Sequence, residues 1–186
     1  MGCAHQLSIP RRSIPTLRID SGEPVVVTIS DKYSGKPMNT IEALLLTTHL
    51  FATATMVGLI WFVQVVHYPL FAAVGAEGFA AYEAAHQRLT SFVVGPLMAT
   101  EGVTALWLAI ATPDGVSRAW PLLGLAVLAV IHTSTVFLQV PQHGALASGY
   151  DALRVRRLVR TNWIRTLGWS IRGIIAAVIV IQMLTH

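Results

Sequence analysis

Charged residues are scarce in this chain. Only 12% of its 186 residues are Asp, Glu, Lys or Arg, whereas a soluble domain usually carries about 25%. Cysteine is scarcer still, because Cys3 stands alone, which excludes an internal disulfide and any cysteine-based metal site. Hydrophobic residues make up 54% of the chain. This balance excludes an ordinary soluble domain and predicts an integral membrane protein with a single membrane domain.

Four long apolar runs predict four transmembrane helices. Their bounds are about Ile41–Val66, Leu89–Ala111, Trp120–Val140 and Trp163–Leu184. Each is near the roughly 20 residues that cross about 30 Å of hydrocarbon, where the backbone must satisfy its hydrogen bonds as a helix. The second run continues an amphipathic stretch that starts near Glu77, and it contains Pro96, which can kink the helix. The predicted fold class is all-α, a four-helix transmembrane bundle.

Arginine placement predicts the topology. The segment between the third and fourth runs holds Arg154, Arg156, Arg157 and Arg160. Arg88 lies between the first two runs, and only Arg118 lies between the second and third. Cytoplasmic loops carry an excess of Lys and Arg. We therefore expect the first and third loops in the cytoplasm and both termini outside. The net charge of +4 does not indicate nucleic-acid binding, because the basic residues cluster at membrane edges.

Residues 1–37 disturb this topology, because they place five basic residues on the expected outer side. Two interpretations stay open. The native start is Met38, directly before the first apolar run, and residues 1–37 are a misassigned extension. Alternatively, residues 1–37 are a genuine tail, disordered or with a short strand at Val25–Thr28. In both cases residues 38–186 form the four-helix domain, whose partner is the lipid bilayer and which could assemble as a homo-oligomer or in a larger membrane complex.

Polar side chains interrupt all four runs. Glu101, His132 and Arg172 fall near run centres. A second set falls at run ends on the expected cytoplasmic face: Gln64, His67, Tyr82, His86, Gln139, His143, Asn162 and Arg165. Such residues are costly inside a bilayer and mark functional sites by default. At about 100° per residue the polar residues of each helix share one face, so bundling brings His67, His86 and His143 to one level.

Three chemistries suit that level. Three imidazoles could bind Zn, Cu, Fe or Ni. Two facing imidazoles could clamp a haem, with Arg165 or Arg157 near its propionates. His, Tyr and Gln could instead hold a quinone headgroup. The spacing matches no recognised metal motif. The alternative is a non-catalytic bundle, an accessory subunit or a small transporter, whose polar stripes serve helix packing. Tyr68 and four tryptophans, Trp61, Trp107, Trp120 and Trp163, are interpreted as interfacial anchors.

A weak internal repeat accompanies these patterns. Phe62–Val65 resembles Phe137–Val140, and Thr90–Val93 lines up with Thr161–Ile164. If this is more than chance similarity between apolar helices, the bundle consists of two duplicated αα-hairpins in parallel orientation. Glu101 then falls opposite Arg172, and the two could form a buried ion pair. With His132 they would fix helix register or, alternatively, form a proton relay or a counter-charge for a substrate.

Two stretches carry a resemblance to a known group. Trp61–Phe71, followed by Phe79, Tyr82 and His86, and then Asn162–Trp169 with Arg172, resemble a group of short bacterial four-helix membrane proteins. The resemblance covers about residues 38–184, leaves the tail outside and implies a bacterial inner-membrane location and a fold, but no reaction. A looser likeness to haem-binding membrane oxidases of porphyrin synthesis rests on size and His-bearing helices alone, without a shared motif.

Overall fold

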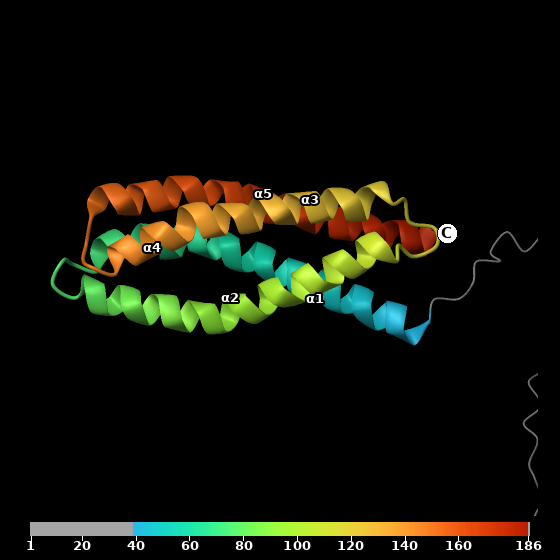
Figure 1. Cartoon of the computed structure of the whole chain (residues 1–186), viewed down its shortest axis with the longest axis horizontal. Helices are drawn as coiled ribbons and strands as arrows, with labels where there is room; N and C mark the ends of the chain where they lie inside the picture. The colour runs from blue at the N-terminus through green and yellow to red at the C-terminus, as the bar shows by residue number, and fades with distance from the viewer. Residues whose placement is uncertain (1–38, 186) are drawn as a thin grey trace, which may run out of the picture. The chain divides into compact units, whose positions relative to one another are not determined.

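The computed structural model describes residues 39–185, which form a bundle of four long helical rods (Figure 1). The first rod joins α1 (Thr40–Phe62), the π-helical turn η1 (Val63–His67) and the 3₁₀ turn η2 (Pro69–Ala73). The second is α2 (Phe79–Ile110). The third joins α3 (Ala119–Ser134), the π-helical turn η3 (Thr135–Gln139) and α4 (Val140–Leu146). The fourth is α5 (Ala152–Thr185).

The predicted all-α fold is confirmed, and the described residues contain no strand. All four rods are long and apolar enough to cross a membrane: Thr40–Ala73, Phe79–Ile110, Ala119–Leu146 and Ala152–Thr185. The start of α1 and the end of α5 lie at the same end of the bundle (Figure 1). The two interpretations of residues 1–37, and the proposed start at Met38, lie outside the described residues.

Local sequence sets where two of the rods begin. Asn39 and Glu42 form a capping box at α1, in which each side chain accepts a hydrogen bond from the other's backbone N–H. Asp151 precedes α5, and its Oδ1 accepts from the backbone N–H groups of Leu153 at 2.8 Å and Arg154 at 3.2 Å. These hydrogen bonds lower the pKa of the exposed Asp151 carboxyl, because they favour its charged form.

The rods are longer than the apolar runs, which corrects the assignment of two basic segments to loops. Arg154, Arg156, Arg157 and Arg160 lie in the first turns of α5, and Arg88 lies inside α2. The 34 residues of α5 span about 51 Å, more than the hydrocarbon thickness. The arginine-bearing end therefore extends beyond the hydrocarbon while remaining helical.

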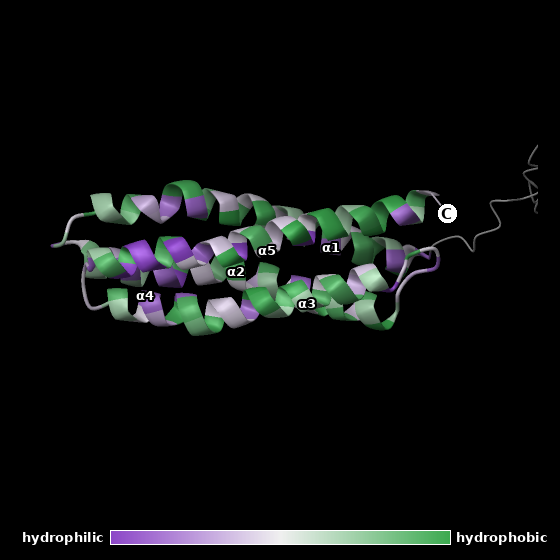
Figure 2. Ribbon diagram, turned by 90° about the horizontal axis from the view of Figure 1, so that it is seen from above, coloured by the Kyte–Doolittle hydropathy of each residue, from purple (hydrophilic) through white to green (hydrophobic). Residues whose placement is uncertain are grey.

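The outer surface is apolar over most of the bundle, and Figure 2 shows the hydrophilic segments gathered mostly toward the end where α4 lies. Large side chains such as Phe51, Phe92 and Phe137 are 70–73% exposed on the isolated chain. In a membrane these side chains face lipid. The central core lies between the rods and contains Met56, Ile60, Ala105, Leu128, Ile131 and Trp169.

Helices α3 and α5 approach each other closely where α5 carries Gly168. A Cβ at Gly168 would lie 2.6 Å from Cγ1 of Ile131, a fully buried side chain of α3. The missing side chain thus sets the spacing of the two rods, as small residues do between membrane helices.

Candidate functional site

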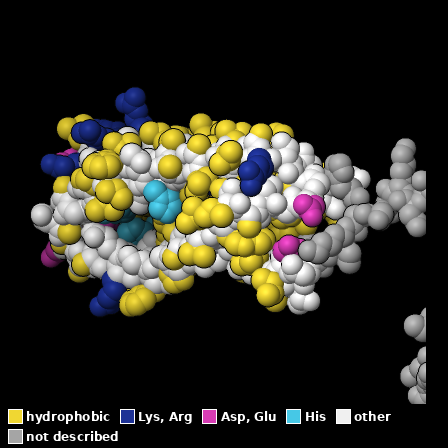
Figure 3. Space-filling model, turned by 45° about the vertical axis from the view of Figure 1, so that its right-hand side comes forward, with side chains coloured by type: hydrophobic (Ala, Val, Ile, Leu, Met, Phe, Trp, Pro, Cys, Tyr) yellow, Lys and Arg dark blue, Asp and Glu magenta, His cyan; other side chains and the backbone are white. Residues whose placement is uncertain are grey.

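A cavity of about 400 Å³ lies between the rods toward the arginine-bearing end. We call it the side cavity. Its apolar lining includes Met56, Ile60, Val63, Val94 and Met98; its polar lining is Tyr68, His86, Gln87, Thr90, Ser91, Gln139, His143 and Arg165. Figure 3 shows a hollow on the flank of the bundle, with histidine side chains at it, near the end that carries most of the Lys and Arg on that face. The cavity therefore has an apolar body and a cluster of polar groups.

His67 and His86 form one hydrogen-bonded pair at this cluster. His67 Nε2 lies 2.9 Å from His86 Nδ1, and the ring centroids are 4.7 Å apart. Thr90, one turn further along α2, places its hydroxyl 3.1 Å from the same His86 nitrogen. His86 is 8% exposed and lines the side cavity. The two imidazoles thus contact each other directly.

Tyr68, His143 and Glu83 form a second chain of hydrogen bonds. The Tyr68 hydroxyl lies 2.8 Å from His143 Nε2, and His143 Nδ1 lies 2.6 Å from Glu83 Oε1. A carboxylate only accepts hydrogen bonds, so His143 donates from Nδ1 and its Nε2 accepts from the Tyr68 hydroxyl. Gln87 donates from its amide to Glu83 Oε1 and to the His143 backbone carbonyl, which holds both partners in place.

A third set of hydrogen bonds positions Arg165 at the side cavity. Asn162 donates to Gln64 Oε1 at 2.9 Å, and Arg165 donates from Nη1 to Asn162 Oδ1 at 3.1 Å. Gln64 in turn donates to the backbone carbonyl of Val159. Arg165 is 7% exposed, and its Nε has no hydrogen-bond partner among the described residues. This nitrogen is a buried donor without a partner in the bundle.

Both π-helical turns lie beside this region. Gln64 belongs to η1 and Gln139 to η3, and both side chains are buried. These are the glutamines of the paired sequences Phe62–Val65 and Phe137–Val140, and each lies in a π turn, as the second residue of η1 and the last residue of η3. Single π turns inside α-helices occur frequently at functional sites.

The structure brings the three predicted histidines together, with 5.2 Å between the ring centroids of His86 and His143. Within residues 39–185, however, no group of three or more His, Cys, Asp or Glu side chains is arranged to hold a metal ion. The third set of hydrogen bonds joins Gln64, Asn162 and Arg165. Gln139 donates a hydrogen bond to the Thr161 hydroxyl.

Tyr82 and Arg157 lie apart from the side cavity. The ring of Tyr82 stacks on His86 at an interplanar angle of 10° but does not line the cavity. Arg157 lines a separate, open hollow with Arg154 and Asp151, and no histidine lines that hollow.

Sequence reasoning missed two members of the cluster. Glu83 is fully buried although it lies in a stretch interpreted as amphipathic, where a carboxylate is expected to face water. Its spacing from Gln87 and Thr90 along one helix face was the available signal. Tyr68 was interpreted as an interfacial anchor, which is wrong: it is 4% exposed and bonded to His143. The η1 turn redirects the residues after Val63, so regular helical geometry could not place it.

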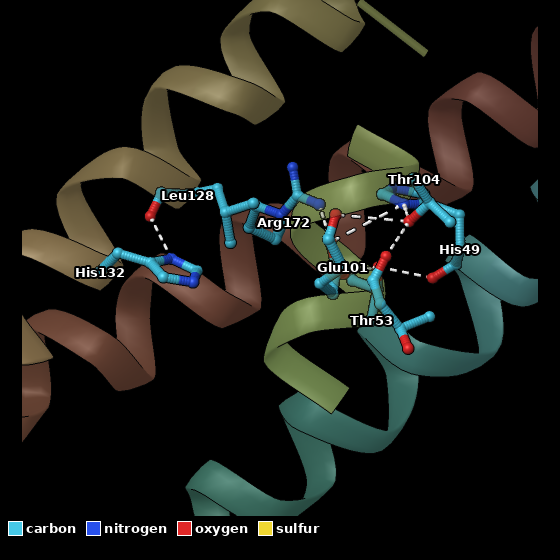
Figure 4. A network of polar contacts seen from close by, with 8 residues as sticks. His49, Thr53, Glu101, Thr104, Leu128, His132 and Arg172 are labelled. Atoms are coloured by element: carbon cyan, nitrogen blue, oxygen red, sulfur yellow. Dashed lines mark hydrogen bonds and ion pairs between the residues drawn. The ribbon is translucent and has the colours of Figure 1, made fainter. Parts of the chain in front are cut away.

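The intramembrane charges form a separate network toward the other end of the bundle (Figure 4). Glu101 forms an ion pair with Arg172 and accepts from the Thr53 hydroxyl. His49 bonds to the Thr104 hydroxyl at 2.8 Å and lies 3.7 Å from Glu101. The adjoining cavity measures only about 10 Å³, about one water molecule or less. The dense packing favours a structural role.

His132 does not join this network. Its Nδ1 lies 2.9 Å from the carbonyl oxygen of Leu128, one turn earlier in the same helix, and Figure 4 shows it apart from the Glu101–Arg172 pair. The expected trio of Glu101, His132 and Arg172 is thus an ion pair plus a histidine bonded to its own helix.

No protein-family model, curated protein or solved structure matches the chain. Its class follows from its own architecture. Four apolar helices with lipid-facing aromatic side chains and a buried polar interior make it a multi-pass integral membrane protein of the four-helix type.

Proposed function

We propose that the chain binds a lipid-soluble small molecule with a hydrogen-bonding ring headgroup, such as a quinone, in the side cavity. The carrying observation is the cavity itself. At about 400 Å³ it falls within the range of small-molecule sites, which combine an apolar lining with a few converging polar groups. Arg165, through its unpartnered Nε, and the Thr90 hydroxyl would donate hydrogen bonds to the headgroup, and the methionine- and valine-lined part would hold its apolar portion.

Hydrogen bonding favours the quinone over the other two chemistries. A haem clamp needs two imidazoles on opposite faces of the macrocycle, but His67 Nε2 and His86 Nδ1 are only 2.9 Å apart. No ring fits between them in this arrangement. Both nitrogens of His143 are also engaged, one by Tyr68 and one by Glu83. A bound quinone leaves all of these hydrogen bonds intact.

The second candidate is a non-catalytic accessory subunit or small transporter. The Glu101–Arg172 network supports it, because that network joins three rods and leaves room for no ligand. Under this candidate the side cavity is filled by lipid or by a partner helix, and no headgroup binds specifically.

Ligand binding is tested with two valine variants. Val94 lines the side cavity, whereas Val93 is 54% exposed on the lipid side of the same helix. Val94→Phe should fill the cavity and weaken binding of a decyl-substituted benzoquinone by about tenfold or more, measured by isothermal titration calorimetry in detergent. Val93→Phe should leave affinity unchanged. Equal loss in both variants, or no binding by the wild type, contradicts the proposal.

We also propose a bacterial inner-membrane location with the arginine-bearing end in the cytoplasm and both termini outside. The support is the arginine bias together with the common end of α1 and α5 (Figure 1).

This orientation predicts a labelling pattern for two exposed serines in a Cys3→Ser background. Ser117 lies between α2 and α3, and Ser148 lies between α4 and α5. In intact cells, a membrane-impermeant maleimide should label the Ser117→Cys variant and miss the Ser148→Cys variant, which should react only after permeabilisation. The reverse pattern would invert the topology.

A further inference from the structure

The Tyr68–His143–Glu83 chain has the order of a base relay. A hydroxyl lies at one end, a fully buried carboxylate lies at the other, and an imidazole is bonded to both. Tyr68 and His143 line the side cavity. Glu83 does not line it and is hydrogen-bonded to His143 Nδ1. In such arrangements the carboxylate orients the imidazole and stabilises the charge that the imidazole gains on accepting a proton.

Two buried atoms without a hydrogen-bond partner among the described residues favour proton transfer along the Tyr68–His143–Glu83 hydrogen bonds. Glu83 Oε2 is buried without a hydrogen-bond partner among the described residues, which is a costly state for a carboxylate oxygen. Arg165 Nε is a buried donor without a partner, on a side chain that lines the same cavity. The unpartnered Glu83 oxygen favours a positive charge on His143, and the unpartnered Arg165 nitrogen favours an anion in the cavity.

We propose that the side cavity is an acid–base site, in which Tyr68, His143 and Glu83 deprotonate a hydroxyl of the bound molecule. This inference rests on the proposed function and specifies its substrate class: a lipid-soluble phenol, enol or quinol. The Tyr68 oxygen accepts the substrate proton while the Tyr68 hydroxyl passes its own proton to His143 Nε2. The substrate O–H bond breaks and an N–H bond forms, giving a substrate oxyanion and an imidazolium. No electron is transferred.

The proton transfer creates two charges, and a different residue stabilises each of them. Arg165 stabilises the oxyanion, and Glu83 stabilises the imidazolium through Nδ1. Because the cluster is buried, both interactions act with little screening by water. Tyr68 would be the catalytic residue, since it touches the substrate, whereas Gln87 positions Glu83 and His143 through its two hydrogen bonds.

A coloured phenol tests this step directly. The probe is 4-nitrophenol carrying a long alkyl chain, which turns yellow on ionisation, bound to the purified full chain in detergent. The pH at which half of the bound probe is ionised should be about one unit or more lower in the wild type than in Glu83→Gln. Glu77→Gln, which removes an exposed carboxylate just before α2, should behave as the wild type. Tyr68→Phe should raise the half-ionisation pH as Glu83→Gln does.

The methyl ether of the same probe separates binding from proton transfer. It has no ionisable hydroxyl, so it should bind to the wild type and to Glu83→Gln with equal affinity. Binding of the ether together with an unchanged half-ionisation pH in both Glu83→Gln and Tyr68→Phe overturns the relay and leaves the proposed binding function standing. Failure of the wild type to bind either probe counts against the binding function instead.

Discussion

Replacing Glu101 by Gln should destabilise the bundle by about 3–5 kcal/mol, because it leaves the guanidinium of Arg172 buried without its counter-charge. Arg172 is 2% exposed and Glu101 is fully buried. The Thr53 hydroxyl and His49 lie around the same carboxylate, so a neutral amide must also fit their hydrogen bonds. The free energy of unfolding in mixed detergent micelles measures the effect, with Glu77→Gln as the exposed control.

A double-mutant cycle shows whether the loss belongs to the pair. In an Arg172→Gln background, Glu101→Gln should cost much less, because no buried charge is then left unpaired. If the two single substitutions simply add, Glu101 and Arg172 do not stabilise the bundle as partners.

Phe71→Ala should cost about 3 kcal/mol or more and abolish ligand binding in the side cavity, because the ring is the hub of the histidine cluster. Phe71 is fully buried, and its ring centroid lies 5.2–5.5 Å from those of His67, Tyr68, Tyr82 and His86. Removing it opens a cavity into which these rings can turn. Calorimetric binding of the decyl benzoquinone and micellar unfolding measure the two effects.

Phe92→Ala is the matched control for this substitution. Phe92 lies in α2 but is 73% exposed on the lipid side. Its removal leaves no internal cavity, so stability and binding should change little. Comparable losses in both variants would show that apolar area on the bundle surface, rather than support of the cluster, governs the effect.

The fold was predictable because four apolar runs of near-spanning length leave the backbone no alternative to helices in lipid. Helix length was only partly predictable. The stretch before Leu89 was recognised as helical from its amphipathic pattern, and α2 begins at Phe79. The start of α5 was not recognised, because the arginines between Arg154 and Arg160 suggested a loop. Charge sets where a helix leaves the hydrocarbon, but it does not end the helix.

The site was predictable only to the level of the membrane. Topology alone brings His67, His86 and His143 to one end of the bundle. The partners of each nitrogen depend on rotation about the helix axes, which an apolar sequence fixes poorly. For this reason the sequence does not indicate that Glu83 is buried, and it predicts Tyr68 at the interface. The polarity of Gln64, Asn162 and Arg165 does indicate these residues, and the structure joins them in one network.

The π-helical turns at Val63–His67 and Thr135–Gln139 have an evolutionary consequence. A π turn encloses one more residue than an α turn, so each is equivalent to a one-residue insertion in a regular helix. Every residue beyond it is rotated by about 100° relative to an uninterrupted helix. Such a site is therefore sensitive to changes in chain length as well as to exchange of side chains. Deleting Val65 or Val66 would keep every polar residue and turn Tyr68 away from His143.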